Sequence, residues 1–216
     1  MSEADKSSET EQSAPYIVLV EGKNPMKLIQ AIFNPPQIKL VDFGSKDNLR
    51  TELKNMANEF MRTDAKVKRL GVIRDAEESS SSTRQSIRDA FLATGFLAPD
   101  EAMRLSAVNS KGISTAFLIL PQGKDSGCLE HGCLDAYQDS ANLACVDALI
   151  NCVEKPKKEP KALDNWLAKA KVHALIAVSK KPEWTLGESG KANLWNRAHP
   201  SLGVIGDFLN LLRNGV

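Results

Sequence analysis

The amino-acid sequence predicts an α/β protein whose parallel sheet has helices on both faces. Short apolar runs rich in β-branched residues alternate four times with stretches whose apolar residues recur at helical spacing. These runs are nearly continuous rather than alternating, which is typical of strands covered on both faces. Parallel neighbours need crossover connections, and the intervening helices supply them. The order of the elements therefore predicts one open parallel sheet.

The elements follow one another in a regular order. The four predicted strands are Tyr16–Val20, Ile38–Val41, Lys68–Ile73 and Ala116–Leu120. Between them, helices are indicated by apolar residues at helical spacing: Met26, Ile29 and Phe33, then Leu49, Leu53 and Met56, then Ile87, Ala90 and Phe91. Pro35 and Pro36 end the first helix, and Ser82 with Gln85 forms a capping box at the start of the third.

The C-terminal part of the chain is predicted to be helical. A helical stretch over Leu134–Val153 precedes a charged, proline-bearing linker, Glu154–Asp164. Two longer helices follow, one around Trp166 and one around Phe208, and we expect them to pack on the sheet. Residues 15–216 are therefore predicted to be a single domain. The preceding residues 1–14 are rich in Ser and Glu, as in disordered tails.

Composition and charge narrow the classes of function. The chain has 216 residues, of which 42% are hydrophobic and 25% charged, as in globular proteins. No apolar run reaches the roughly 18 residues of a membrane span. The first residues lack the basic and apolar regions of a secretory signal, so we expect a cytoplasmic protein without a membrane partner. The net charge of +1 does not indicate a broadly basic surface, although a local basic patch stays open.

The four cysteines fall into two groups. Cys145 and Cys152 share a helix face with Leu149, and we expect these thiols to be small core side chains. Cys128 and Cys133 flank His131 and resemble a metal cluster, but their spacing matches no established zinc pattern. Both a zinc site and a structural role remain open for this second group. Disulfides are not expected in a reducing cytosol.

Acidic residues gather where two predicted strands end. Glu21 follows the first strand, and Asp75 and Glu77 follow the third within "RLGVIRDAEESSSST". Ligands bind at the carboxyl ends of strands in open parallel sheets. Side chains two residues apart on an extended chain point the same way, so Asp75 and Glu77 can converge. A Mg²⁺ ion needs few protein carboxylates, and this cluster predicts such a site. Solvated acids on ordinary loops are the alternative.

These residues carry a resemblance to a known family. A Glu-Gly after the first strand, followed by an Asp-x-acid pair after a later one, resembles the Toprim domain of topoisomerases, primases and overcoming-lysogenization-defect nucleases. More closely, the chain resembles a Toprim-related bacterial family, domain of unknown function 3226. The stretches that carry this likeness span most of residues 16–212: "VEGKNPMKLIQ", "GVIRDAEE", "LPQGKDSGCLEHG", "KAKVHALIA" and "LWNRAHPSLGVIGDFLNLL". The resemblance implies a Toprim-like, Rossmann-like sheet with a helical C-terminal extension.

The resemblance also implies chemistry. It makes Glu21 the general acid/base or a metal ligand, and Asp75, Glu77 and Glu130 ligands of Mg²⁺ or Mn²⁺. Metal-activated water would then attack a phosphodiester of nucleic acid. The usual second Asp is a Glu here, and the extra methylene moves that carboxylate by roughly 1.5 Å, one C–C bond. We therefore expect weak activity that is stronger with Mn²⁺ than with Mg²⁺.

Lysines are the candidates for phosphate contacts. Lys23 follows the first strand, and Lys169 and Lys171 are expected at the start of a C-terminal helix. Of these, Lys23 and Lys171 are the predicted phosphate-binding residues. Solvated helix lysines are the alternative.

The acidic residues also allow two other interpretations. "DAEESSSST" is similar to the haloacid-dehalogenase signature, with Asp75 as a phosphate-accepting nucleophile, but that family places its aspartates after the first strand. An interaction module without catalysis is the alternative function. The resemblance implies a partner ATPase for it, with a role in phage defence. The oligomeric state does not follow from the sequence.

Overall fold

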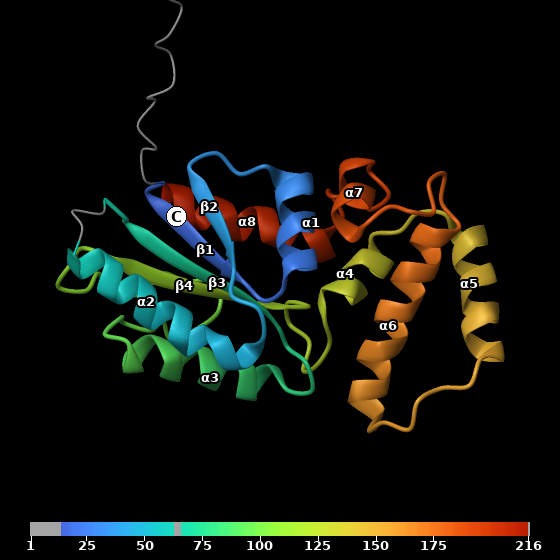
Figure 1. The fold of residues 1–216 in the computed structure, drawn as a ribbon, viewed down its shortest axis with the longest axis horizontal. Helices are drawn as coiled ribbons and strands as arrows, with labels where there is room; N and C mark the ends of the chain where they lie inside the picture. Colours follow the sequence, from blue (N-terminus) through green and yellow to red (C-terminus); the bar gives the residue numbers. More distant parts are fainter. Residues whose placement is uncertain (1–13, 63–65, 216) are drawn as a thin grey trace, which may run out of the picture.

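The structure is a computed structural model that describes residues 14–62 and 66–215. It contains four parallel strands in the order β2-β1-β3-β4: β1 (Tyr16–Val20), β2 (Ile38–Asp42), β3 (Arg69–Asp75) and β4 (Ser114–Leu120). Figure 1 shows helices on both faces of this sheet. The predicted α/β fold class and its four strands are confirmed. The predicted tail of residues 1–14 lies outside the described residues except for Ala14.

Two helices cover one face of the sheet. They are α2 (Leu49–Arg62) and α3 (Ser80–Ala93), and a short 3₁₀ turn, η1 (Lys46–Asn48), precedes α2. Leu19 of β1 and Val72 of β3 are buried in the same hydrophobic cluster as Ile87 of α3. This side is called the α3 face below.

The other face carries α1 (Lys23–Phe33) and α8 (Pro200–Asn214). Val20 and Ile73 are buried on this side together with Phe208 of α8. A Cβ on Gly71 of β3 would lie 2.5 Å from Cδ1 of Leu212. Helix α8 therefore packs against β3 at a position where the strand has no side chain. This side is called the α8 face.

The remaining helices extend the α8 face: α4 (Leu129–Asp135), α5 (Ser140–Cys152), α6 (Pro160–Ala177) and α7 (Leu186–Lys191). In Figure 1, α6 lies between α4 and α5. The predicted helical stretch over Leu134–Val153 is confirmed for most of its length, but residues 136–139 between α4 and α5 are not helical. Asp139 caps the second of them by accepting the N–H groups of Ala141 and Asn142, both at 3.1 Å.

The start of α3 also differs from the prediction. Ser79 is its N-cap, and the Ser79 hydroxyl accepts the N–H of Ser82 at 3.2 Å. Thr83 donates its hydroxyl back to the Ala76 carbonyl at 3.2 Å. The predicted box at Ser82 and Gln85 is therefore wrong, because the hydroxyl run supplies a cap one turn earlier. The serine-rich stretch starts the helix directly after the acidic residues.

The buried face of α5 is the opposite of the predicted one. Val146 and Ile150 pack into the core, whereas Cys145 and Cys152 are exposed and Leu149 is 52% exposed. The helix is apolar on both sides, so spacing alone does not reveal which side meets α6.

Within the described residues, no helix is both long and apolar enough to cross a membrane.

Candidate functional site: an acidic cluster facing α6

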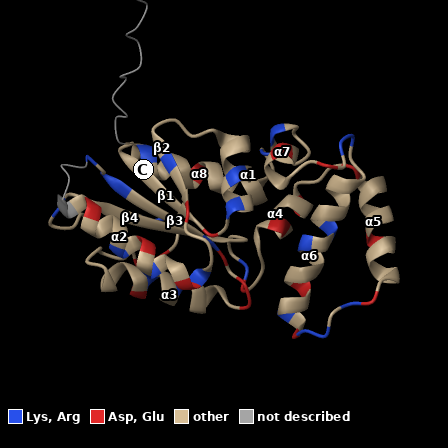
Figure 2. Ribbon diagram, viewed as in Figure 1, with Lys and Arg blue, Asp and Glu red and all other residues tan. Residues whose placement is uncertain are grey.

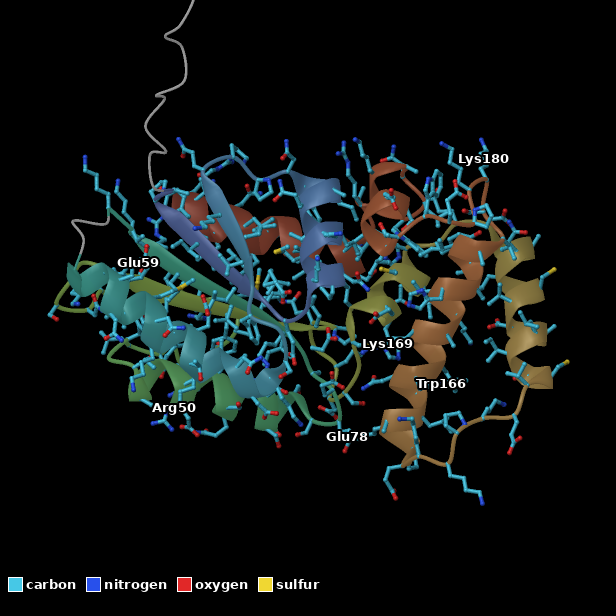
Figure 3. The ribbon with its side chains drawn as sticks, viewed as in Figure 1. Arg50, Glu59, Glu78, Trp166, Lys169 and Lys180 are labelled. Carbon is cyan, nitrogen blue, oxygen red and sulfur yellow. The ribbon has the colours of Figure 1, made fainter. Side chains whose placement is uncertain are left out.

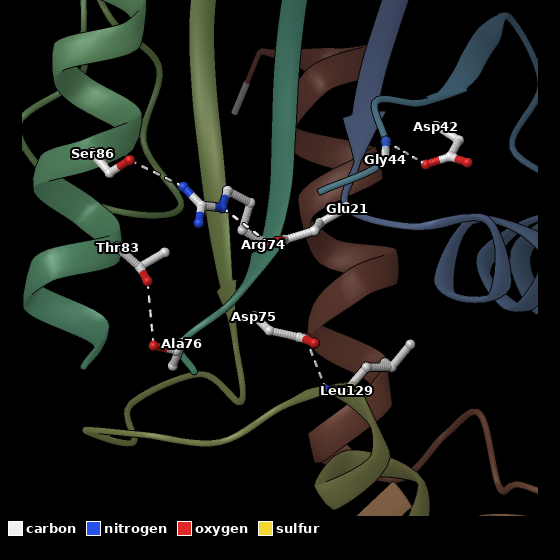
Figure 4. Close-up of polar contacts among 9 residues, drawn as sticks. All are labelled: Glu21, Asp42, Gly44, Arg74, Asp75, Ala76, Thr83, Ser86 and Leu129. Atoms are coloured by element: carbon white, nitrogen blue, oxygen red, sulfur yellow. Dashed lines mark hydrogen bonds and ion pairs between the residues drawn. The ribbon is translucent and has the colours of Figure 1, made fainter. Parts of the chain in front are cut away.

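Glu21 and Arg74 form an ion pair on the α3 face. Val20 of β1 pairs with Ile73 of β3. Glu21 and Arg74 are the next residues of these two segments, so they lie side by side. The Arg74 Nε donates to Glu21 Oε2 at 3.0 Å, and its Nη1 donates to Ser86 Oγ at 3.2 Å (Figure 4). The Arg74 side chain is 3% exposed and that of Glu21 16%. Glu21 therefore serves as the counter-ion of a buried guanidinium.

Asp75 lies on the other side of the sheet from Arg74, because successive strand side chains alternate between faces. Its Oδ1 accepts the N–H of Leu129 at 2.9 Å, at the first residue of α4 (Figure 4). Part of the Asp75 residue is exposed to solvent, but its carboxyl group is enclosed by protein. The structure thus separates Glu21 from Asp75, although both follow strand ends that were predicted to form one site.

Glu77 lies beyond the strand in an unusual backbone conformation. Its φ of 53° is left-handed, which costs a residue with a side chain about 1–2 kcal/mol. Its backbone N–H and C=O both pair with Gly127, each at 2.8 Å, which fixes the loop. The Glu77 Oε2 accepts from Asn165 Nδ2 of α6 at 3.3 Å. Glu77 is therefore directed toward α6.

One face of α6 meets this acidic loop. Lys161, Asn165 and Lys169 recur every four residues and so lie along one side of the helix. The Lys161 ammonium donates to the Glu78 carbonyl at 2.8 Å, and Asn165 holds Glu77. Figure 2 shows acidic segments in the loop after β3 and basic segments on α6, and Figure 3 labels Lys169 and Glu78 at this contact. We call these three residues the α6 polar stripe.

Glu130 completes the group that we call the acidic cluster: Asp75, Glu77, Glu130, Asn165 and Lys169. Glu130 is 9% exposed and lies in the first turn of α4. Among the described residues, its Oε2 is buried without a hydrogen-bond partner. Asn165 is 6% exposed, and its Oδ1 is also buried without a partner. Each unpaired buried acceptor costs about 1–3 kcal/mol.

The cluster carries more negative than positive charge, and its pKa values reflect that. Burial raises the pKa of Asp75 well above its usual value, and Glu130 adds to the effect. Lys169 and the Leu129 N–H act in the opposite direction. For Lys169 itself, burial lowers the pKa, but Glu130 and Asp75 outweigh it, and the pKa is raised. Lys169 therefore stays charged and neutralises part of the cluster.

The donor set of the cluster suits a hard divalent cation. Its acceptors are carboxylate and amide oxygens, the ligands that Mg²⁺ and Mn²⁺ prefer. Two of these oxygens have no hydrogen bond of ordinary geometry among the described residues, although the Cys128 thiol interacts with the Glu130 carboxyl group. In residues 14–62 and 66–215, however, no three His, Cys, Asp or Glu side chains are already grouped closely enough to hold a metal ion. Binding would therefore require Asp75, Glu77 and Glu130 to draw together.

The cysteine–histidine group forms a helix cap. The His131 Nδ1 accepts the Cys128 N–H at 3.1 Å, and its Nε2 lies 2.9 Å from Asp164 Oδ2. Burial raises the pKa values of Cys128 and Cys133, so both remain neutral thiols. The hydrogen bonds of His131 support a structural role for this group.

The predicted phosphate-binding lysines lie elsewhere. Lys23 is exposed at the first position of α1. Lys171 is in the middle of α6, where its ammonium pairs with Asp147 of α5 at 2.8 Å. The lysine in the acidic cluster is Lys169, two residues earlier and on another side of the helix. Its position in a series of residues spaced four apart, after Lys161 and Asn165, is the signal in the sequence that could have singled it out.

A solvent-open pocket of about 700 Å³ lies at the strand ends on the α3 face. Glu21 and Glu77 both line it, together with Lys46 and Arg74. Hydroxyl groups from the start of α3 form much of the remaining wall: Ser79, Ser82, Thr83 and Ser86. Glu77 therefore lies between this pocket and the acidic cluster.

The fold and site define an α/β protein with an acidic cluster at the carboxyl end of a parallel sheet. The chain belongs to the family described as "Protein of unknown function (DUF3226)", whose model matches residues 15–214. No curated protein matches it. A similar solved structure is the C-terminal region of the Xanthomonas campestris pv. campestris OLD protein. It shares 12% identity, with 94% of this chain and 96% of that chain covered and a TM-score of 0.44.

Proposed function

We propose that the acidic cluster binds Mg²⁺ or Mn²⁺ and that the protein performs metal-dependent phosphodiester chemistry on nucleic acid. The observation that supports this most is the pair of buried, unpartnered oxygens on Glu130 and Asn165. A closed structural cluster would satisfy such atoms, whereas a cation would use them as ligands. The motif resemblance to Toprim nucleases points to the same chemistry.

The residues have distinct roles in this proposal. Asp75, Glu77 and Glu130 would hold the cation, which, when bound, activates water and stabilises charge on phosphate oxygens. Lys169 neutralises part of the carboxylate charge and presents an ammonium that can contact a phosphate. Glu21 remains the candidate proton acceptor, acting from the pocket that it shares with Glu77.

A cleavage assay on single- and double-stranded nucleic acid with Mg²⁺ and Mn²⁺ tests the proposal. We expect weak cleavage that is faster with Mn²⁺, because the longer Glu77 side chain holds the ion less rigidly. Glu77→Asp should raise the Mg²⁺-dependent rate, since it restores the usual Asp-x-Asp spacing. Glu77→Gln should abolish cleavage, and the exposed Glu183→Gln is the matched control.

A second candidate is a non-catalytic module that binds a partner ATPase in phage defence. The ion pair between Glu21 and Arg74 favours this reading, because it engages the proposed proton acceptor in a structural contact. The formal net charge of +1 also fits a protein partner better than free nucleic acid. Inactivity of both the wild type and Glu77→Asp on every nucleic acid, with and without the ATPase, would lead us to this reading.

A further inference from the structure

The side-chain amide of Asn165 forms a hydrogen bond through its nitrogen but none through its oxygen among the described residues. It lies in the second turn of α6 and is nine-tenths buried. Its Nδ2 donates to Glu77, while its Oδ1 is enclosed without a donor in the described part of the chain. Burying an amide oxygen without a hydrogen bond costs free energy that an apolar side chain would avoid. A purely structural role does not explain this oxygen.

A second unpartnered oxygen lies on a different element of the same cluster. Glu130 Oε2 projects from α4, and the Glu130 charge acts on both Asp75 and Lys169. The charge of Glu77 also contributes to the raised pKa of Lys169, and Glu77 accepts a hydrogen bond from Asn165. Residues of α4, α6 and the loop after β3 are thus linked by charge interactions and by the Asn165–Glu77 hydrogen bond. When all are ionised, the three carboxylates and one ammonium of the acidic cluster leave two negative charges in excess, which a divalent cation would neutralise.

We propose that Asn165 Oδ1 is a neutral oxygen ligand of that cation, and that its Nδ2 positions Glu77 as a second ligand. The inference rests on the cation site proposed above and adds a residue from α6 to it. A neutral amide suits this position because a fourth carboxylate would be repelled by the three already present. The carbonyl oxygens of Asn are ordinary ligands of hard cations. Cation binding would then join α6 to the loop after β3.

Two substitutions at this position have opposite expected effects. Asn165→Leu removes the unpartnered oxygen with little change in volume, so the metal-free protein should melt at a higher temperature while losing cation affinity. Asn165→Asp keeps an oxygen ligand but adds a buried negative charge beside Glu77. Its metal-free form should melt at a lower temperature, and its stabilisation by the cation should exceed that of the wild type.

The test uses the full chain stripped of metal with a chelator. Thermal melting is recorded with increasing MnCl₂ or MgCl₂, and Mn²⁺ affinity is measured by isothermal titration calorimetry. Asn165→Leu should weaken Mn²⁺ binding at least about tenfold, the lower end of what loss of a metal-supporting group costs. The exposed Asn151→Asp on α5 controls for an added charge. Its Mn²⁺ affinity should equal that of the wild type.

The outcomes separate this inference from the proposed function. If the wild type binds Mn²⁺ and Asn165→Leu binds it equally well, the ligand role of Asn165 is wrong and the cation site stands. If the wild type binds neither ion, both are wrong. Should Asn165→Leu fail to fold, Asn165→Asp decides alone: a metal-induced rise in melting temperature no larger than that of the wild type overturns the inference.

Discussion

Breaking the ion pair between Glu21 and Arg74 by replacing only one partner should destabilise the protein strongly. Glu21→Leu would leave the Arg74 guanidinium, which is 3% exposed, with the Ser86 hydroxyl as its described hydrogen-bond partner. Removing one partner of a buried ion pair costs about 3–5 kcal/mol. Glu21 keeps some exposure and lines a solvent-open pocket, so water can partly replace it. We therefore expect a loss of about 3 kcal/mol, the lower end of that range.

That loss is measurable in a chain of this size. At roughly 2–4 °C per kcal/mol for chains of about 150–250 residues, Glu21→Leu should lower the melting temperature by about 6–12 °C. Glu21→Gln should cost less, because its amide oxygen still accepts from Arg74 Nε. The double variant Glu21→Leu/Arg74→Met should recover much of the loss, since replacing both partners with apolar groups is often neutral.

Chemical denaturation of the four proteins in this double-mutant cycle gives the coupling energy. A melting temperature for Glu21→Leu within about 1 °C of wild type, where about 3 kcal/mol should shift it several degrees, would refute a structural role for the pair. The cycle also separates Glu21 from the cation site. The melting shift caused by Mn²⁺ should survive in Glu21→Gln. Loss of that shift would show that Glu21 is a ligand.

Three further predictions concern other parts of the molecule. Because the folded-state pKa of Asp75 is raised, its carboxyl group favours folding below pH 3.8 and progressively less as the pH rises through the raised value. Metal-free Asp75→Asn should therefore exceed wild type in stability at neutral pH, by roughly 1–3 kcal/mol. In denaturant titrations that gain should vanish toward pH 3.8, and a pH-independent difference would contradict it. Gly71→Ala should lower the free energy of unfolding by about 1–3 kcal/mol, because the added methyl group overpacks against Leu212. An unchanged unfolding midpoint would argue against the close packing of α8 on β3. Exposed Cys145 and Cys152 should react quickly with a thiol reagent in the folded protein, and the two buried cysteines only after unfolding, so that four fast thiols would be the wrong result.

The strands could be predicted because burial on both faces leaves a direct mark in the sequence. β4 is buried at every position, and its apolar run over Ala116–Leu120 is continuous. The predicted third strand ends at Ile73, two residues before the end of β3, because a charged Arg74 is not expected in a buried strand until its partner is known. Glu21 supplies that partner from the neighbouring strand, and the register that brings them together is a long-range property. The sequence alone does not specify it.

The site was predicted in part for the same physical reason. Asp75 and Glu77 interact because they are two residues apart, but Glu77 lies beyond the end of β3 in a left-handed conformation, so strand alternation does not place it. The expected convergence of Glu21 with Asp75 is not observed. It depends on which face of the sheet each strand end presents, and this relation between two strands cannot be read from either strand alone. Asn165 and Lys169 are almost ninety residues farther along the chain, and only the packing of α6 brings them to the cluster. Their four-residue spacing fixes a shared helix face but does not say what that face contacts.

The single-domain organisation over residues 15–216 remains a prediction. Two buried clusters lie on opposite faces of one sheet, and α6 reaches from the C-terminal helices to the loop after β3 through Lys161 and Asn165. Loss of these contacts should therefore affect the stability of the sheet as well as that of the helices.

Calorimetric titration of Mn²⁺ into the metal-free, full-length protein is the most direct test of the cation site. The account predicts saturable binding by the wild type and at least about tenfold weaker binding by Asp75→Asn, whose neutral side chain still accepts the Leu129 N–H. Glu183→Gln, which removes an exposed carboxylate outside the acidic cluster, should bind as the wild type does. Absence of saturable heat for the wild type with Mn²⁺ and with Mg²⁺, or equal affinities for the wild type and Asp75→Asn, would contradict the account.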